Sequence, residues 1–123
     1  MTSKERILTA FDHKESDRIP VDFNGHRSSG IMAQAYVKLR ELLRLPPSKL
    51  YVYDFIQQLA LIEDDVLDIV GADVVEVGNG YQYKEDYWKD WTLPDGTPCK
   101  IPAFIQVERD GDAWVVRGDE GQV

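Results

Sequence analysis

The amino-acid sequence predicts an α/β fold in which strand–loop–helix units precede an antiparallel sheet. Three observations support this fold class. An apolar stretch at residues 19–23 precedes apolar positions that recur at helical spacing over residues 31–42. A second apolar stretch, residues 74–77, follows another helical segment. Beyond residue 88, turn-forming pairs recur regularly between strand-like runs, which is typical of an antiparallel meander.

The first predicted element is a short amphipathic helix over residues 4–11. Thr2 and Glu5 stand three residues apart. At this spacing, the N-cap hydroxyl and the N3 carboxylate each accept a hydrogen bond from the other residue's backbone N–H, which forms a capping box. Pro20 suits a first strand whose N–H side needs no partner. We therefore expect a helix across the bottom of a sheet, followed by a strand at residues 19–23.

A polar, glycine-containing loop connects this strand to the next predicted helix. Ser28 or Ser29 is suited to cap that helix, which covers residues 31–42. The pair Pro46-Pro47 is expected to end it sharply. Strand, loop and helix together form one βα unit.

The middle of the chain has a less regular pattern. Residues 50–53 fit either a short strand or an extended connection, and residues 56–62 favour a helix. Residues 64–70 predict a short helix with acidic side chains in its first turn, where the helix dipole favours them. Gly71 supplies the left-handed residue that ends it. Residues 74–77 then predict a buried second strand.

The C-terminal part predicts an antiparallel meander with one face in water, because apolar and polar residues alternate there. The predicted turns are the pairs at 95–96, 110–111 and 120–121, and the strand-like runs cover residues 91–93, 104–107 and 113–116. We therefore divide the chain into residues 1–87, with the first helix and βα units, and residues 88–123, with the antiparallel excursion.

Composition excludes several classes of function. The chain has 123 residues and a net charge of −8, which argues against nucleic-acid binding because phosphates require a basic surface. No apolar run approaches the ~20 residues of a membrane span, and Met1 leads into charged residues rather than a signal peptide. The single cysteine, Cys99, cannot form an internal disulfide, so the expected compartment is a reducing cytoplasm.

Several short motifs occur in an order that resembles the start of the uroporphyrinogen decarboxylase superfamily. This superfamily holds the haem-pathway decarboxylase and the cobamide-dependent methyltransferases of methylotrophic metabolism. Each motif is short, but their order extends over nearly the whole chain. They are Lys-Glu-Arg (4–6), His-Lys-Glu (13–15), Asp-Arg-Ile-Pro-Val (17–21), Ser-Ser-Gly-Ile (28–31), Tyr-Asp (53–54), Gln-Gln-Leu-Ala (57–60), Gly-Ala-Asp-Val-Val (71–75) and, more loosely, Trp-Lys-Asp-Trp (88–91) and Asp-Gly-Thr (95–97).

The resemblance implies a (β/α)₈ TIM barrel, which needs roughly 200 or more residues. A chain of 123 residues has room for the helix-capped beginning and about two of the eight strands of such a barrel. We therefore expect an N-terminal fragment, as a truncated gene product or one piece of a split protein. The fragment alone is expected to lack catalysis. Its uncovered strand edges and helix faces are expected to make it a homo-oligomer.

The resemblance also locates the expected site, because functional residues of such barrels follow the C-terminal ends of the strands. After the first strand these are Asp22, Asn24, His26 and Arg27, and Asn79 occupies the matching stretch after the second. A guanidinium in a glycine loop can bind a carboxylate or phosphate through two hydrogen bonds. The alternative is a solvated loop that caps a helix. We predict substrate binding by these residues, and no catalytic residue.

Two departures from the superfamily's pattern point away from tetrapyrrole decarboxylation. The decarboxylases carry an arginine-rich stretch after the first strand, where this chain has Arg27 alone. They also carry an aspartate after the second strand, where this chain has Glu-Val-Gly-Asn at 76–79. The Ser-Ser-Gly-Ile motif instead resembles the methyltransferase branch, linked to cobamide or folate. Tetrapyrrole decarboxylation and a non-catalytic, self-associating interaction module remain the alternatives.

The methyltransferase resemblance implies zinc, held by His and Cys residues of later strands, and a corrinoid methyl carrier in the parent protein. Its substrate would be a small molecule or a corrinoid protein. His13, His26 and Cys99 have no metal-ligand spacing. We therefore expect no metal and no cofactor in these residues, and we expect Cys99 to be a small packed hydrophobe.

The three tryptophans have two candidate uses. Trp88, Trp91 and Trp114 all lie in the predicted meander. They could form a ligand platform, but large aromatic side chains more often seal the inner face of a sheet. We expect them to seal the meander.

Overall fold

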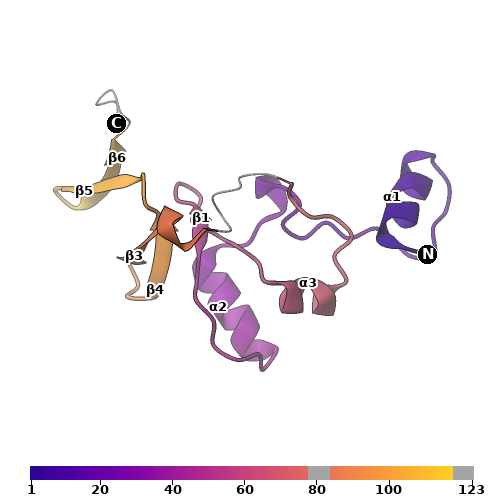
Figure 1. Ribbon diagram of the computed structural model, residues 1–123, viewed down its shortest axis with the longest axis horizontal. Coiled ribbons are helices and arrows are strands. Elements are labelled where there is room, and N and C mark those ends of the chain that lie inside the picture. Colours follow the sequence, from indigo (N-terminus) through magenta and orange to yellow (C-terminus); the bar gives the residue numbers. More distant parts are fainter. Residues whose placement is uncertain (78–83, 118–123) are drawn as a thin grey trace.

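The computed structural model describes residues 1–77 and 84–117 and has a mixed α/β composition. The described elements are α1 (Ser3–Phe11), a 3₁₀ helix (Arg27–Ser29), α2 (Ala33–Leu42), β1 (Val52–Asp54), β2 (Leu59–Ala60), α3 (Asp64–Val70), a second 3₁₀ helix (Glu85–Tyr87), β3 (Trp88–Thr92), β4 (Pro98–Pro102), β5 (Gln106–Asp110) and β6 (Ala113–Arg117). Figure 1 shows α1 at one end of an elongated molecule and the β5–β6 hairpin at the other.

The predicted beginning of a TIM barrel is wrong. The described strands form three separate two-stranded antiparallel sheets, β1–β2, β3–β4 and β5–β6. The only parallel contact among described residues is an isolated bridge between Tyr51 and Lys100. A TIM barrel is instead a closed ring of parallel strands whose faces are both covered.

Neither of the two expected barrel strands forms. Residues 19–23 are extended without a ladder, and the Ile19 side chain is 85% exposed. Residues 74–77 also form no strand, and Val77 is 96% exposed. Buried parallel strands require neighbours on both edges and cover on both faces. In the described part of the chain, residues 19–23 gain a single backbone–backbone hydrogen bond, from the Asp73 N–H to the Val21 carbonyl, and the packing of Phe23 against the core, so neither run becomes a strand.

The helix predicted over residues 56–62 is also wrong, because the chain turns back there to form β2. The Gln57 N–H donates to Asp54 Oδ1 (2.9 Å), which closes a local turn of the kind that aspartate favours. Gln58 lies in the left-handed region with a φ of 55°. This reversal brings Leu59 and Ala60 back against β1.

The helix predicted over residues 31–42 forms as α2, but its ends differ from the prediction. Its N-cap is Met32, which makes no side-chain capping hydrogen bond, because Ser28 and Ser29 belong to the preceding 3₁₀ helix. It ends at Leu42, before Pro46-Pro47, where Arg44 adopts a φ of 56°.

The two other helix predictions are confirmed with their caps. Thr2 Oγ1 accepts from the Glu5 N–H (3.2 Å), and Glu5 Oε2 accepts from the Thr2 N–H (2.8 Å). This is the predicted capping box of α1. α3 ends at Gly71 with a φ of 68°, a left-handed conformation that costs glycine little.

The expected meander consists of two separate hairpins rather than one sheet. The turns at Gly96 and Gly111 have φ values of 88° and 58°, as their Asp-Gly pairs predict; the predicted turn at residues 120–121 lies outside the described residues. The sequence did not predict β4, because its first and last residues are the prolines Pro98 and Pro102. Both prolines are tolerated, since among the described residues the second edge of β4 meets the chain only around Lys100, whose N–H donates to the Leu50 carbonyl.

The core lies where α2 and α3 meet β1, β2 and β4. Its largest fully buried side chains include Tyr36, Val52, Val66 and Ile101. The Lys100 N–H donates to the Leu50 carbonyl (2.8 Å) and attaches the β3–β4 hairpin to the segment before β1. No helix within residues 1–77 and 84–117 is long and apolar enough to cross a membrane.

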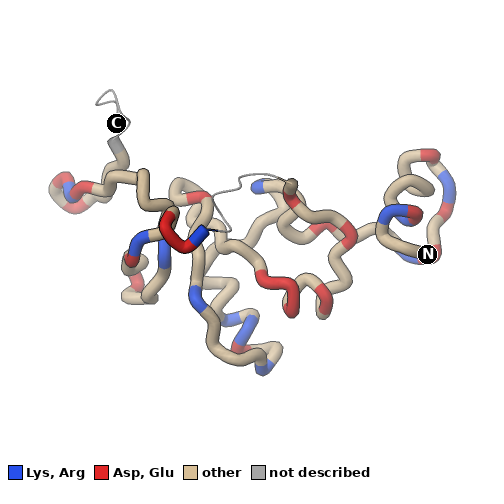
Figure 2. The backbone as a smooth tube through the Cα atoms, viewed as in Figure 1, with Lys and Arg blue, Asp and Glu red and all other residues tan. Residues whose placement is uncertain are grey.

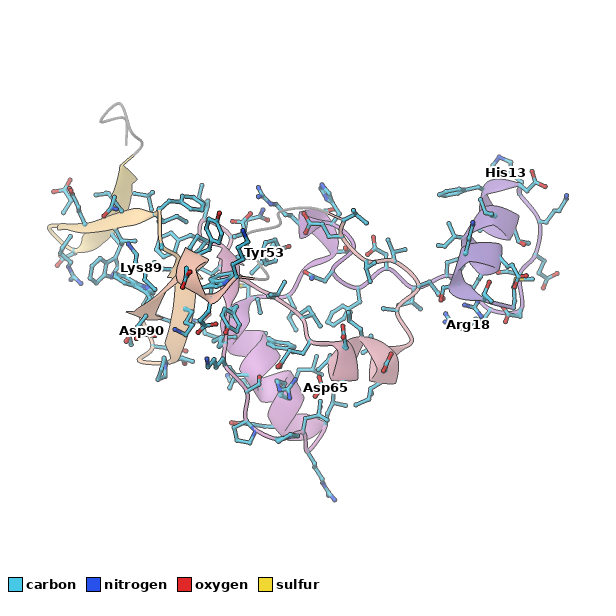
Figure 3. The ribbon with its side chains drawn as sticks, in the orientation of Figure 1. His13, Arg18, Tyr53, Asp65, Lys89 and Asp90 are labelled. Carbon is cyan, nitrogen blue, oxygen red and sulfur yellow. The ribbon has the colours of Figure 1, made fainter. Side chains whose placement is uncertain are left out.

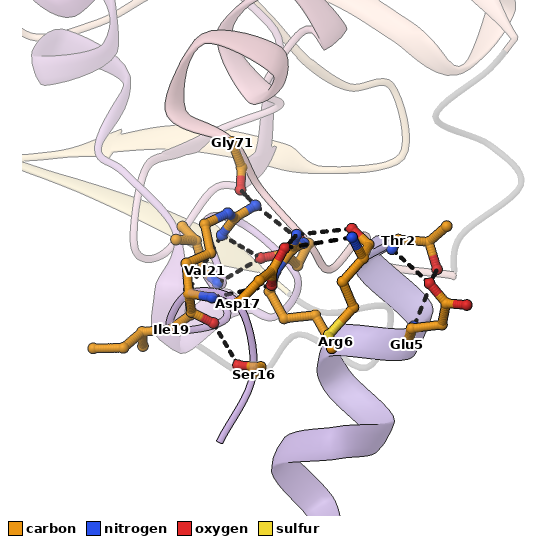
Figure 4. A network of polar contacts seen from close by, with 11 residues as sticks. Thr2, Glu5, Arg6, Ser16, Asp17, Ile19, Val21 and Gly71 are labelled. Carbon is orange, nitrogen blue, oxygen red and sulfur yellow. Dashed lines mark hydrogen bonds and ion pairs between the residues drawn. The ribbon is translucent and has the colours of Figure 1, made fainter. Parts of the chain in front are cut away.

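A cluster of four charged side chains, here called the N-terminal clamp, ties α1 to the segment after α3 (Figure 4). Arg6 Nε lies 2.7 Å from Asp17 Oδ1, and Arg18 Nη1 lies 2.7 Å from Asp73 Oδ2. Arg6 Nη1 also donates to Asp73 Oδ1. The clamp comprises Arg6, Asp17, Arg18 and Asp73.

The clamp holds both of its carboxyl groups ionised. The hydrogen bond from Arg6 lowers the pKa of Asp17 well below its usual range. Burial raises the pKa of Asp73, whose side chain is 0% exposed, but hydrogen bonds from the Val21 amide and both arginines outweigh burial and lower it. Outside this clamp, charges of both signs are spread along the chain (Figure 2).

Candidate functional site

The predicted site loop, residues 22–30, is organised first by hydrogen bonds within itself. Asp22 Oδ1 accepts from the Gly25 N–H (2.8 Å) and from Ser29 Oγ (2.9 Å). His26 Nδ1 accepts from the Ser28 N–H (3.2 Å) and caps the 3₁₀ helix. Asp22 Oδ1 and His26 Nδ1 therefore make contacts within the loop and shape it.

Gly25 allows the loop to approach the segment after α3. A Cβ atom at this position would lie 2.6 Å from both Asp22 Oδ1 and Val74 Cγ1, closer than real Cβ contacts. Any larger residue would push the loop away from Val74. The glycine therefore sets how closely the site loop is seated.

The next residue, Asn24, connects the loop to β1. Asn24 is buried and adopts a φ of 70°, a left-handed conformation that asparagine tolerates better than most residues. The buried Tyr53 hydroxyl donates to Asn24 Oδ1 (3.3 Å). Figure 3 shows Tyr53 on the β1 side of the molecule, far from His13 beside α1.

Arg27 lies at the rim of an open groove beside β1. Its Nε is 3.3 Å from Asp54 Oδ2, and its side chain is 49% exposed while that of Asp54 is 8% exposed. Asp54 is fixed in turn by the Gln57 N–H (2.9 Å) and Nε2 (3.3 Å). The groove has a volume of about 430 Å³ and is lined by Arg27, Tyr53, Asp54, Phe55, Ile56, Gln57, Phe104, Ile105 and Val116.

The structure therefore separates the predicted site residues. Asn24 and Arg27 contact β1 through Tyr53 and Asp54. Asp22 and His26 are occupied within the loop, and Asn79 lies outside the described residues.

Sequence reasoning missed Tyr53, Asp54 and Gln57 as part of the site. Their Tyr-Asp and Gln-Gln motifs were visible, but their position depends on the β1–β2 reversal. The helix predicted over residues 56–62 placed Gln57 elsewhere.

The residues present do not fit a zinc centre. Within the described ranges, no group of three or more His, Cys, Asp or Glu side chains could hold a metal ion. Cys99 is buried in β4, and burial, reinforced by the negative charge of Asp95, raises the pKa of its thiol to about 11. Such a thiol stays protonated at neutral pH and is a poor ligand, because metals bind the thiolate.

Comparison with known proteins leaves the site to be interpreted from its own geometry. No protein-family model, curated protein or solved structure matches the chain. What the site offers is one half-exposed guanidinium, backed by a buried carboxylate and placed beside an apolar groove. This arrangement is suited to a small molecule with an anionic group and an apolar body.

Proposed function

We propose that the chain is the substrate-binding part of a methyltransferase related to the uroporphyrinogen decarboxylase superfamily, and that Arg27 binds an anionic group of its substrate. The order of short motifs along the sequence supports the relationship. The observation that carries the binding role is the placement of Arg27, half-exposed at the groove and oriented by Asp54. The proposed location is the cytoplasm, on the basis of the lone Cys99.

The chemistry of Arg27 supports a carboxylate ligand. A guanidinium has five N–H donors, of which Asp54 engages the Nε side. Asp54 is the only ion-pair or hydrogen-bond partner of the Arg27 side chain among the described residues. Its two Nη groups can therefore donate in parallel to a carboxylate. Phe55, Ile56 and Phe104 line the same groove and suit the apolar part of such a ligand.

The presence of one arginine favours the methyltransferase branch over tetrapyrrole decarboxylation. A tetrapyrrole carries many carboxylates, and a site with one guanidinium would leave most of them unpaired. Among the residues that the structure describes, Arg27 is the only arginine or lysine that lines this groove. A small substrate with a single anionic group fits this charge better.

Titration with butyrate, followed by NMR amide shifts, tests the proposal. Wild-type protein is expected to show saturable shifts at residues around Arg27 and Gln57. Arg27→Gln should weaken binding about 10- to 100-fold, the value of a charge-assisted contact of roughly 1.5–3 kcal/mol. Arg44→Gln is the matched control, because Arg44 is an exposed arginine beyond α2.

Two results would contradict the proposed role. Equal butyrate affinity in wild type and Arg27→Gln would remove the binding function. A large drop in melting temperature with unchanged affinity would make Arg27 a structural residue. Tighter binding of an octacarboxylate porphyrin than of butyrate would favour the decarboxylase alternative instead.

A further inference from the structure

A second candidate site lies on the two C-terminal hairpins, where two grooves share the walls Trp91, Pro94 and Trp114. The larger groove, about 910 Å³, adds Asp90, Arg109 and Asp112 to these walls. The smaller groove, about 300 Å³, adds Phe55, Ile56, Gln58 and Val116. The smaller groove adjoins the Arg27 groove, but none of the described residues in its lining carries a charged side chain.

The aromatic rings of the smaller groove stand nearly perpendicular to one another. Trp91 and Trp114 have ring centroids 5.2 Å apart at 79°, and Phe55 and Trp91 have centroids 6.1 Å apart at 73°. Two rings in this arrangement form a corner that offers ring faces from two directions. We call Phe55, Trp91 and Trp114 the aromatic corner.

Backbone contacts fix the corner from two sides. Trp91 belongs to β3 and is paired with Cys99 of β4. The turn that carries Phe55 is held by the hydrogen bond from the Ala33 N–H to the Gln58 carbonyl (2.8 Å). Gln58 keeps a φ of 55°, a sparsely populated conformation that is retained where surrounding contacts impose it.

The electrostatics of the corner favour a cation. The Arg109 guanidinium carbon already lies 5.0 Å from the Trp114 ring centroid, so this indole accepts positive charge at its face. The described lining of the neighbouring groove includes two carboxylates, Asp90 and Asp112, and one guanidinium, that of Arg109, so negative charge is in excess there. The Asp90 side chain is 92% exposed, although Lys100 Nζ lies 3.1 Å from its Oδ1; Figure 3 labels Asp90 near Lys89. The net charge of −8 adds a long-range attraction for cations.

We propose that the aromatic corner binds a quaternary ammonium group. Ring faces attract cations, and alkylated ammonium groups are recognised in this way because they demand no hydrogen bonds. The smaller groove fits this demand, since among the described residues its lining offers only the Gln58 amide and the two indole N–H groups as polar side-chain groups. A primary ammonium would lose its hydration without replacement. This site shares Phe55 and Ile56 with the Arg27 groove, but Arg27 does not line it.

Titration with choline and with its neutral isostere, 3,3-dimethylbutan-1-ol, tests this proposal. The indole N–H signals of the three tryptophans report the location by NMR. Choline is expected to shift Trp91 and Trp114 but not Trp88, which is buried against Tyr51. Choline should also bind at least about five-fold more tightly than the isostere, the factor that a cation–π contact supplies.

Three variants sharpen the test. Trp114→Leu should weaken choline binding about ten-fold, while Trp88→Phe should leave it unchanged. Arg109→Gln should tighten choline binding about two- to three-fold, because it removes a competing cation from the Trp114 ring. Arg44→Gln, at an exposed arginine beyond α2, should leave choline binding unchanged.

Several outcomes would overturn the assignment. Equal affinity for choline and the neutral isostere would show an apolar groove without cation selectivity. Weaker choline binding in Arg109→Gln would show that Arg109 supports the site instead of competing with choline for the Trp114 ring. The absence of saturable shifts at Trp91 and Trp114 would show that the corner only seals the hairpins.

Discussion

Arg40 and Asp65 form a two-point ion pair that joins α2 to α3. Arg40 Nη1 lies 2.9 Å from Asp65 Oδ1, and Nη2 lies 3.0 Å from Asp65 Oδ2. Glu63 and the Tyr36 hydroxyl also contact Nη1. Hydrogen bonds from Arg40 lower the pKa of Asp65. Because Arg40 itself is only 7% exposed, the two helices are joined by a buried cation with its acids at the surface.

Replacing Arg40 should therefore loosen the core. Arg40→Met keeps much of the apolar stem but removes the contacts to Asp65 and Tyr36, and we expect a loss of about 1.5–3 kcal/mol in the free energy of unfolding. Urea denaturation followed by circular dichroism measures this loss. Lys38→Met, an exposed cation on the same helix, is the control. Equal stability of the two variants would show that the ion pair contributes nothing.

Acid should weaken the N-terminal clamp. Asp17 and Asp73 have folded-state pKa values below the ordinary aspartate range. Their contribution to stability is therefore complete above about pH 4 and is lost as the pH falls toward the folded-state values. Asp73→Asn should lower the melting temperature at pH 7 by several degrees, and this difference should shrink at pH 3.

The control for the clamp is Asp86→Asn, because Asp86 is an exposed acid in the second 3₁₀ helix. Thermal melts of both variants at pH 7 and pH 3 complete the measurement. A loss in Asp73→Asn that is the same at both pH values would mean that shape, rather than charge, gives Asp73 its role.

The Cys99 thiol should be nearly inert in the folded protein. Burial first, and the nearby charge of Asp95 second, raise its pKa to about 11. At pH 8 the thiolate fraction should be roughly 100-fold lower than in the unfolded chain, and reaction with a thiol reagent such as DTNB should slow accordingly. Because Cys99 is the single cysteine, the signal is unambiguous. Similar rates with and without denaturant would show that the site opens readily.

The same pKa shift predicts a loss of stability at alkaline pH. The folded state holds the thiol proton more tightly than the unfolded chain, so the contribution of Cys99 is complete below about pH 8.5 and falls as the pH rises toward 11. Cys99→Val should reduce this slope. Denaturation of wild type and Cys99→Val at pH 8, 9 and 10 measures the slope of the free energy of unfolding against pH. The same slope in both proteins would show that other titrating groups determine it.

Self-association remains our expectation for the chain. Ile19, Ile56 and Val77 are 85%, 88% and 96% exposed, and Phe11 is 75% exposed. Exposed apolar side chains and two-stranded sheets with open edges favour pairing with another copy. Light scattering across a dilution series should show mass rising with concentration. A constant monomer mass at high micromolar concentration would contradict this expectation.

Local signals in the sequence predicted local structure well. The capping box of α1 and the glycine end of α3 involve residues only a few positions apart, so their geometry follows from their spacing. The strands expected at residues 19–23 and 74–77 failed because an apolar run does not specify its partners. The prolines of β4 argued against a strand in the sequence. They lie at its two ends, opposite Thr92 and Trp88, where a two-stranded hairpin accepts residues without an N–H donor.

The candidate sites show the same division. The polar loop containing Asn24 and Arg27 was visible in the sequence, but its partners Tyr53 and Asp54 depend on a tertiary contact. The tryptophans were expected to seal the meander, and Trp88 does so as a buried residue. Trp91 packs partly against the core and also lines the smaller groove together with Trp114.

The N-terminal clamp has a consequence for synthesis on the ribosome. Arg6 and its partner Asp73 are separated by 67 positions, so at ~5–20 residues per second the acid is made about 3–13 s after the arginine. During that interval α1, with nine residues, is too short to be stable alone in water. Local contacts such as those of Thr2, Glu5 and Asp17 are then present to hold it. The first helix of the nascent chain therefore forms and melts repeatedly until Asp73 is synthesised and stabilises it.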